Sequence, residues 1–226
     1  MSDNERILLV LTSHSDLGGV RATGYYVGEA AEPWQVFVDA GYAVDVASIA
    51  GGAPPEDGRN DDDPTQRAFL TDPHIAGQLA DTRALAEVNA DDYDAVFFVG
   101  GHGAMWDFPT APAVTAVGRE VYESGGIVAA VCHGPAALVG ITLSDGAPLV
   151  AGKRVAGFTN DEEAAVGLTG VVPFLLADAL TARGATHLPG PDFTENVVTD
   201  QRVVTGQNPQ SAAGVARAVV AALAER

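Results

Sequence analysis

The sequence contains a single cysteine, Cys132, and a single lysine, Lys153, among its 226 residues. One cysteine excludes a disulfide within the chain and a zinc site built from several cysteines. The chain also lacks the run of about 18 apolar residues that is typical of a membrane span. Its first six residues do not show the basic and then apolar layout of a secretory signal. We therefore expect a cytoplasmic protein that does not act at a membrane.

Positive charge is scarce, with 12 basic residues against 30 acidic ones and a formal net charge of −18. Such a chain repels phosphate backbones, so we expect no nucleic-acid partner. An acidic, lysine-poor composition is typical of a halophilic protein that works in a cell with high internal salt. A GC-rich genome would also deplete lysine, and the composition does not separate these two explanations.

If the composition reflects adaptation to high salt, the free energy of unfolding should rise as potassium chloride is added. The physical reason is that salt screens the repulsion among the excess carboxylates. Thermal unfolding in a series of potassium chloride concentrations measures this effect. A stability that stays constant from low salt upward would contradict the interpretation.

Hydrophobic periodicity predicts alternating strands and helices along the chain. The predicted strands are Ile7–Leu11, Ala43–Ser48, Asp94–Val99, Ile127–Val131, Val155–Phe158, Asn196–Val198 and Arg202–Thr205, and the main predicted helices are Tyr26–Ala40, Ala111–Ser124, Val171–Ala182 and Ser211–Leu223. This order predicts an α/β, flavodoxin-like sandwich, with helices on both faces of a mostly parallel sheet. No repeat or linker divides the chain, so we expect a single domain over residues 1–226.

Two stretches interrupt this pattern. Pro33 falls inside the first predicted helix, where it should mark the true start of the helix or kink it. Residues 51–66 are rich in aspartate, glycine and proline, and we expect them to form a long acidic surface loop.

The apolar run Ile127–Val131 ends at Cys132, and Gly134 and Pro135 then reverse the chain. Proline suits the first turn of a helix. A strand, one reactive residue and a helix start make a nucleophile elbow, here with cysteine in place of the usual serine. The turn lifts the thiol clear of the sheet, and a helix N-terminus favours its thiolate. We predict that Cys132 is a nucleophile with His133 beside it, because a cysteine that only fills a core would not need this turn.

A glycine-rich turn at residues 100–103, Gly-Gly-His-Gly, follows the predicted strand Asp94–Val99. It lacks the Gly-Lys-Ser/Thr of a phosphate-binding loop and the spacing of a dinucleotide motif. Because glycine has no Cβ, its backbone N–H can approach a substrate oxygen closely. The carboxyl ends of parallel strands bring such loops together. We therefore predict an oxyanion hole formed by the N–H groups of Gly101 and His133.

Five segments of the sequence together resemble the ThiJ/PfpI superfamily, which has a class I glutamine amidotransferase-like fold. They are Gly24–Trp34, residues 100–103, Ala130–Pro135, Gly157–Glu163 and Val204–Ala212. The resemblance spans about residues 6 to 224. It is strongest to the heat-shock-chaperone subgroup, which includes the glutathione-independent glyoxalases (glyoxalase III).

The resemblance implies a role for each of four side chains. Cys132 would be the nucleophile and His133 its partner, while Glu163 matches the acidic third member of the triad. Glu29 matches a carboxylic acid that touches the cysteine sulfur. In an apolar pocket Glu29 would be protonated, because desolvation raises its pKa, and could then donate a hydrogen bond to the thiolate. The resemblance implies no metal and no cofactor.

Other interpretations of these residues stay open in the sequence. Glu162 stands next to Glu163, and only the position in the motif favours Glu163 as the triad acid. Gly100, His102 and Trp106 are possible pocket residues. His102 could equally satisfy its own turn, and tryptophan residues are more often part of a core.

The expected function is the conversion of methylglyoxal or a similar small dicarbonyl compound to a 2-hydroxy acid through a Cys132 hemithioacetal. The alternatives are a deglycase that acts on glycated amines and thiols, and a non-enzymatic stress chaperone or redox sensor. A glutamine amidotransferase is disfavoured, because the only late histidine, His187, is followed by Leu188 and Pro189 instead of the His-x-Glu pair of that family. By resemblance alone, we expect a homodimer.

Overall fold

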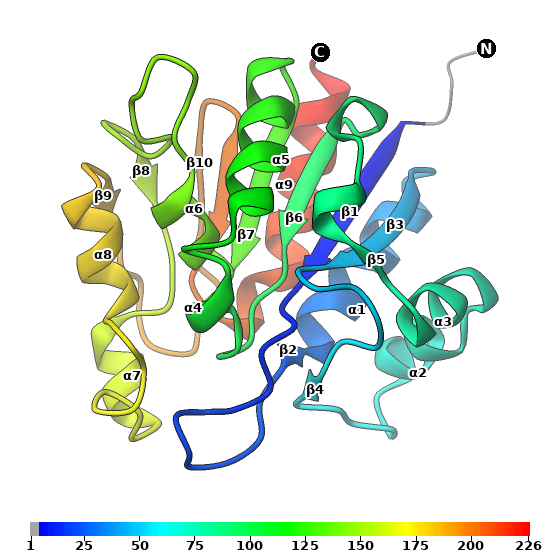
Figure 1. The fold of residues 1–226 in the computed structure, drawn as a ribbon, viewed down its shortest axis with the longest axis horizontal. Coiled ribbons are helices and arrows are strands. Elements are labelled where there is room, and N and C mark those ends of the chain that lie inside the picture. Colours follow the sequence, from blue (N-terminus) through cyan, green and yellow to red (C-terminus); the bar gives the residue numbers. More distant parts are fainter. Residues whose placement is uncertain (1–4) are drawn as a thin grey trace.

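A seven-stranded sheet runs through the middle of the protein in the computed structural model, which describes residues 5–226 (Figure 1). In sheet order its strands are β10 (Val197–Asp200), β11 (Val203–Gly206), β7 (Ile127–Val131), β6 (Ala95–Phe98), β1 (Arg6–Leu11), β3 (Ala43–Ser48) and β5 (Arg83–Ala84). The β10–β11 pair is antiparallel, and every other neighbouring pair in this sheet is parallel.

The order of the strands identifies the type of sheet. When β1, β3, β6, β7 and β11 are counted along the chain, their order in space is 2-1-3-4-5. This is the flavodoxin-like order, in which a ligand binds beyond the carboxyl ends of the strands, where the winding reverses. The reversal lies between β1 and β6. The predicted fold class is confirmed, and the turns that follow these two strands belong to the candidate site.

Helices cover both faces of the sheet. They are α1 (Val27–Asp39), α2 (Pro64–Thr71), α3 (Pro73–Ala80), α4 (Ala104–Asp107), α5 (Pro112–Glu123), α6 (Ala136–Gly140), α7 (Asn160–Ala165), α8 (Leu176–Ala182) and α9 (Ala212–Ala224), with short 3₁₀ turns η1 (Leu85–Glu87), η2 (Ala90–Asp92) and η3 (Pro209–Ser211). Helices α1 and α9 pack on each other on one face, and α5 and α6 lie on the other (Figure 1). Within residues 5–226, none of the helices combines the length and the apolar character that crossing a bilayer requires.

The central strands are apolar along their whole length because helices bury both of their faces. Residues 127–131 and residues 7–11 are almost completely shielded from solvent. Aromatic side chains join the sheet to the layers on either side. Phe37 of α1 contacts Phe97 of β6 edge to face at a centroid distance of 6.0 Å, and Phe98 contacts Phe108 in the same way at 5.7 Å. This packing holds the strand ends that carry the candidate site in fixed positions.

Residues 51–66 are more structured than the predicted acidic loop. Strand β4 (Glu56–Asp57) pairs with β2 (Tyr25–Tyr26) in a two-stranded sheet, and α2 begins at Pro64. The carboxylate of Asp63 accepts hydrogen bonds from two backbone N–H groups of the first turn of α2, and proline fits that turn. One of the acidic residues in this stretch, Asp63, is therefore the N-cap of a helix and not only part of a solvated surface.

Three further boundaries differ from the predictions. The predicted strand over residues 155–158 shrinks to β8 (Arg154–Val155), which pairs with β9 (Thr186–His187) outside the main sheet. Helix α8 begins at Leu176 instead of Val171, because Pro173 disfavours helical geometry in the residue before it. Pro33 lies well inside α1, so it does not mark the start of the helix.

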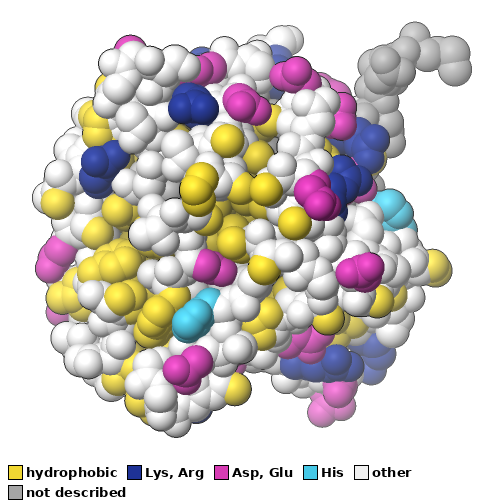
Figure 2. All heavy atoms as spheres, viewed as in Figure 1, with side chains coloured by type: hydrophobic (Ala, Val, Ile, Leu, Met, Phe, Trp, Pro, Cys, Tyr) yellow, Lys and Arg dark blue, Asp and Glu magenta, His cyan; other side chains and the backbone are white. Residues whose placement is uncertain are grey.

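Charged side chains are distributed over the surface. Figure 2 shows acidic and basic groups scattered across one face, while hydrophobic side chains gather over α8. On this face the described residues form no continuous patch of one charge. The acidic side chains are therefore dispersed over the face shown in Figure 2.

Candidate active site

Cys132 lies at a sharp turn between β7 and α6. Its backbone has φ = +60°, a left-handed conformation that is unusual for a residue with a Cβ. The turn is fixed because the N–H of Cys132 donates to the carbonyl of Gly206 at 3.0 Å and that of Gly134 to the carbonyl of Val131 at 2.7 Å. A side chain at Gly134 would come within 2.2 Å of the carbonyl oxygen of Phe98, so only glycine fits. This geometry matches the predicted elbow.

A chain of hydrogen bonds links the thiol to a carboxylate. The Sγ atom of Cys132 lies 3.3 Å from Nδ1 of His133, and Nε2 of His133 lies 2.8 Å from Oε2 of Glu163. The imidazole must donate its Nε2–H to Glu163, because a carboxylate can only accept. When His133 is neutral, Nδ1 is therefore a free acceptor that faces the sulfur.

The protonation of this pair follows from burial and hydrogen bonding. Burial, with a smaller contribution from the neighbouring His102, lowers the pKa of His133 to about 4. Burial opposes the charge of Glu163, but hydrogen bonds from His102 and His133 outweigh it and lower the pKa of Glu163 to about 2. At neutral pH the pair is thus a carboxylate and a neutral imidazole, which is a general base.

The structure brings Glu163, and not Glu162, to His133. Both residues lie in the first turn of α7 and both are buried. Glu162 forms a capping box with Thr159 and accepts a hydrogen bond from the N–H of Phe193 at 2.8 Å. Its carboxylate therefore serves the backbone, while that of Glu163 serves the two histidines.

His102 lies in the cavity and takes part in the same network. Its Nε2 donates to Oε1 of Glu163 at 3.0 Å, and its ring lies 4.0 Å from that of His133. The sequence left open whether this residue lines the pocket, and the structure places it there. A side chain at its neighbour Gly103 would meet Thr12 and His14, which shows how closely the loop after β1 packs here.

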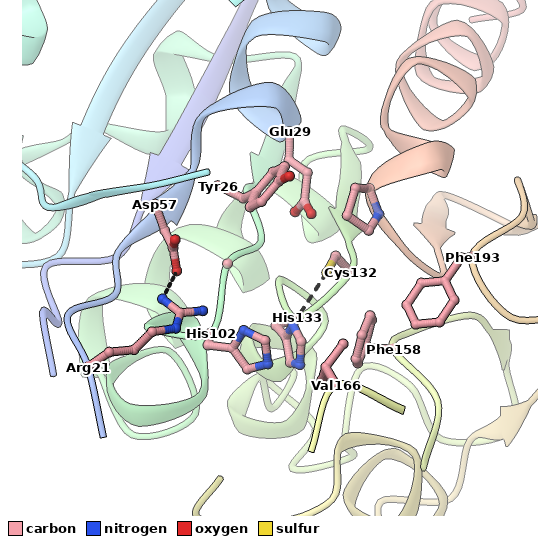
Figure 3. A pocket seen from close by; sticks show the side chains of 12 residues that line it. Arg21, Tyr26, Glu29, Asp57, His102, Cys132, His133, Phe158, Val166 and Phe193 are labelled. Atoms are coloured by element: carbon pink, nitrogen blue, oxygen red, sulfur yellow. Dashed lines mark hydrogen bonds and ion pairs between the residues drawn. The ribbon is translucent and has the colours of Figure 1, made fainter. Parts of the chain in front are cut away.

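Glu29 lies above the sulfur, in the first turn of α1. Its side chain points toward Cys132 and is completely buried (Figure 3). Neither carboxyl oxygen has a hydrogen-bond partner at regular geometry. A Cβ on Gly100 would lie 2.1 Å from Oε2 of Glu29 and 2.9 Å from Cβ of Cys132, so glycine is required for the acid and the thiol to meet.

The buried acid and thiol can carry only one negative charge between them. Burial raises the pKa of Glu29 well above its usual range, although the adjacent thiol of Cys132 and amide of Gly100 act in the opposite direction. Burial and the charge of Glu29 likewise raise the pKa of Cys132. Two adjacent buried anions would repel each other strongly, so the pair keeps at least one proton near neutral pH. Which atom holds that proton decides whether the sulfur is a nucleophile.

Two backbone amides favour the ionised sulfur. Hydrogen bonds from the N–H groups of His133 and Gly101 lower the pKa of Cys132. These are the amides that the sequence assigned to an oxyanion hole. The predicted contribution of a helix N-terminus is smaller than expected, because α6 has only five residues and begins four positions after the cysteine. The thiolate therefore depends on the two amides, and it requires Glu29 to be neutral, because the charge of Glu29 raises the pKa of Cys132.

The cavity above Cys132 has a volume of about 160 Å³. It is lined by Arg21, Tyr26, Glu29, Asp57, Gly101, His102, Cys132, His133, Phe158, Val166, Phe193 and Pro209. Gly100 is packed behind this lining. Trp106 is not part of it, because its indole stacks on the ring of His14 at 5.0 Å with the two planes 3° apart. Trp106, one of the possible pocket residues in the sequence, does not line this cavity.

Several lining residues carried no signal in the sequence. Arg21 and Asp57 form an ion pair at 2.8 Å, although 36 residues separate them. Phe158 and Phe193 come from two different loops, and their rings meet edge to face. Phe158 follows Gly157 in a segment already noted for its family resemblance. That segment was the one available clue to its position.

His102, His133 and Glu163 also form the group of side chains that could surround a metal ion within the described part of the chain, with ligand atoms within 4.8 Å of one another. The Nε2 atoms of both histidines already form hydrogen bonds with the carboxylate of Glu163. A metal ion would therefore compete with those hydrogen bonds.

Comparison with known proteins gives the class to which this site belongs. The DJ-1/PfpI family matches residues 20–222, and the chain therefore belongs to it, as the resemblance to ThiJ/PfpI proteins predicted. The chain is 36% identical to glutathione-independent glyoxalase HSP31 of Saccharomyces cerevisiae, over 92% of this chain and 93% of the yeast protein. It is 33% identical to Glyoxalase 3 of Candida albicans, over 96% of this chain and 98% of that protein.

Solved structures agree with this placement. The crystal structure of glyoxalase III from Candida albicans matches with a TM-score of 0.89 at 32% identity, over 96% of this chain and 97% of the other. The X-ray structure of Rapid Encystment Protein 24 kDa from Francisella tularensis matches with a TM-score of 0.93 at 36% identity, over 97% and 99% of the two chains. These likenesses extend over nearly the whole chain.

Acid should destabilise the protein in two steps. An unfolded histidine binds its proton near pH 6.5, whereas folded His133 does so near pH 4, so folding opposes protonation between these values. Stability should fall by up to about 3 kcal/mol as the pH drops through this window. Glu163 adds a further loss between about pH 4.5 and pH 2. Thermal unfolding from pH 7 to pH 3.5 measures the first step.

A matched pair of variants separates His133 from other titrating groups. His133→Asn should flatten the dependence of stability on pH between 6.5 and 4, because asparagine does not titrate. His74→Asn removes a histidine with a side chain 64% exposed and serves as the control for the loss of an imidazole outside the cavity. Equal slopes in wild type and His133→Asn would show that this imidazole is not the destabilising group.

Proposed function

We propose that this protein is a glutathione-independent glyoxalase. It converts 2-oxoaldehydes such as methylglyoxal, with the uptake of one water molecule, to 2-hydroxy acids. The observation that carries the proposal is the thiol of Cys132, which lies 3.3 Å from a neutral His133 that is fixed by Glu163. The long, well-covered matches to proteins named as glutathione-independent glyoxalases support the same reaction. No thiol cofactor is needed, because the enzyme supplies the sulfur.

The first step is addition of the sulfur to the aldehyde carbon. The thiolate of Cys132 forms a C–S bond while the carbonyl oxygen takes the electron pair, which gives a hemithioacetal. The N–H groups of Gly101 and His133 are placed to hold that oxygen. Glu29, protonated in its buried position, supplies the proton that neutralises it. An uncharged substrate suits the small, largely apolar cavity.

The second step is an internal exchange of oxidation state. The neutral His133 removes the proton from the aldehyde carbon, and the electron pair moves to the ketone oxygen to give an enediolate. Return of that proton to the second carbon, with transfer of the hydroxyl proton of the first carbon to the second oxygen, leaves an alcohol at the second carbon and a thioester at Cys132. The first carbon has been oxidised and the second reduced, so no external oxidant is required. Water then cleaves the thioester to release lactate from methylglyoxal.

The reaction is tested by incubating the purified protein with methylglyoxal and no added thiol. Proton NMR and a stereospecific lactate assay should show lactate forming as methylglyoxal disappears. Disappearance of methylglyoxal without lactate would reject the proposal, because simple adduct formation with arginine side chains also consumes the aldehyde.

A deglycase activity has the same chemical requirements and is distinguished by its substrate. Glycated amines or thiols prepared free of dicarbonyl should be processed no faster than they release methylglyoxal spontaneously. Faster processing would favour the deglycase. The homodimer stays a prediction, to be tested by light scattering of the intact protein.

A further inference from the structure

Phe193 adopts an unusual backbone conformation at the mouth of the cavity. Its φ is +52°, a region that bulky side chains rarely enter, and its side chain is 41% exposed. Strain of this kind persists only where the surroundings impose it, and it gathers at functional sites. An exposed large aromatic residue and a strained backbone occur here at the same position. Their coincidence calls for a functional explanation.

Three completely buried polar side chains hold this loop. Glu162 accepts from the N–H of Phe193 at 2.8 Å, and Gln207 accepts from the N–H of Gly190 at 2.7 Å. The amide of Asn208 donates both to Glu162 and to the carbonyl of Thr194, each at 2.8 Å. Burying polar groups is unfavourable unless they are hydrogen-bonded. Here that polar network fixes the loop around Phe193 in one position.

The held ring completes an apolar wall of the cavity. The ring of Phe193 meets that of Phe158 at 6.4 Å, and Phe158 lies 4.3 Å from the ring of His133. Val166 lines the same side and is 43% exposed. Arg21 and Asp57 lie on the opposite side (Figure 3). The cavity therefore has one apolar wall, which leads from the triad to the entrance, and one charged wall.

We propose that Phe193, Phe158 and Val166, here called the apolar wall, bind the substituent R of a 2-oxoaldehyde R–CO–CHO and make the enzyme favour large apolar substituents. This inference rests on the proposed function. With the aldehyde carbon bonded to Cys132, R can extend along Phe158 toward Phe193, where contact with the rings removes apolar surface from water. Glu162 is then a positioning residue, because it acts by holding Phe193.

The test compares phenylglyoxal, which yields mandelate, with methylglyoxal. For Phe193→Asn, the ratio of kcat/KM for phenylglyoxal to that for methylglyoxal should fall about five- to tenfold. Asparagine tolerates the left-handed backbone, so this variant should fold. Val166→Ala should lower the same ratio, whereas Val38→Ala should not, since Val38 has the same 43% exposure but does not line the cavity. An unchanged ratio in Phe193→Asn would overturn the apolar wall.

Glu162→Ala tests the positioning role, because it removes the oxygen that accepts from the N–H of Phe193, whereas glutamine can keep that acceptor. It should lower the phenylglyoxal ratio in the same direction, and adding Phe193→Asn to it should cause little further loss, because both changes remove the same contact. If the two losses multiply, Glu162 does not act through Phe193, and its proposed role is overturned.

An alkylation experiment keeps this inference separate from the proposed function. Cys132 is the only cysteine, so mass spectrometry reads its modification without interference. N-phenyl iodoacetamide should react faster relative to iodoacetamide in wild type than in Phe193→Asn. If the wild type forms no hydroxy acid, the proposed glyoxalase function is rejected, but the ratio of the two alkylation rates still tests the apolar wall. If that ratio is the same in wild type and Phe193→Asn, the apolar wall is overturned whether or not the enzyme is active.

Discussion

Replacing Cys132 with alanine should abolish lactate formation, lowering kcat/KM at least about 1000-fold. The loss should be this large because the sulfur forms the bond on which every later step depends, so no other group in the cavity can take its place. His133 and Glu163 would remain, but a base without a nucleophile only enolises the free aldehyde. Steady-state lactate production by wild type and Cys132→Ala gives the ratio directly.

Folding of the variant can be controlled without altering the argument. Alanine and cysteine both carry a Cβ, so the left-handed backbone at φ = +60° is equally strained in both. Cys132→Ser keeps the shape of the side chain and should be just as inactive, since a serine hydroxyl ionises far less readily than a thiol. Melting temperatures close to that of the wild type would attribute the loss to chemistry. Lactate formation that survives either change would reject a covalent mechanism.

The same variants address the non-enzymatic alternative. A chaperone would suppress the aggregation of a client protein without using the thiol, so its action should persist in Cys132→Ala. A redox sensor would lose its response together with the sulfur. Aggregation and oxidation assays on the inactive variant therefore separate these two possibilities from the enzyme and from each other.

The parts of the fold that the sequence predicted correctly are local in the chain. The elbow at Cys132 follows from a β-branched run that ends in His-Gly-Pro, all within nine residues. Strands such as β3 and β7 have the predicted bounds, because their apolar runs end at glycine or polar turns. The flavodoxin-like order follows from alternating strands and helices, since parallel strands need such crossovers. Short-range pattern was sufficient for these features.

Features that depend on distant contacts were not predictable. No local signal separates Glu162 from Glu163, because both occupy the same turn of α7. Their functions differ only because His133 meets one carboxylate and Phe193 meets the other. The pairing of β4 with β2 across about 30 residues likewise left no periodicity in the acidic stretch.

Backbone conformation explains why Phe193 was missed. The left-handed region is expected for glycine or asparagine, so a phenylalanine there has no sequence signature. The buried side chains of Glu162, Gln207 and Asn208 hydrogen-bond to the loop that contains Phe193. These three residues are separated by up to 46 residues in the chain. Their meeting is a property of the folded protein.

Replacing Glu29 with glutamine should lower kcat/KM for methylglyoxal about 100- to 10,000-fold, a range typical of a lost acid–base group. Glutamine fills the same space but carries no titratable proton, so the shared proton of the acid–thiol pair is lost. Burial still raises the pKa of Cys132, but the contributions of Glu29, which also raise it, are removed, so that pKa should fall. The pH profile of iodoacetamide alkylation should therefore move to lower pH while lactate formation is lost, because the sulfur ionises but the proton donor is missing.

Glu29→Gln should lose activity without losing stability, so misfolding of the variant cannot produce the expected result. The pKa of folded Glu29 lies above its unfolded value, so this group contributes stability at low pH that is lost as the pH rises through the folded pKa. Glu29→Gln removes that loss and should melt no earlier than wild type at pH 8. Glu32→Gln, three residues along the same helix, should retain the alkylation profile of the wild type. An unchanged profile in Glu29→Gln would mean that Glu29 does not influence the ionisation of the sulfur.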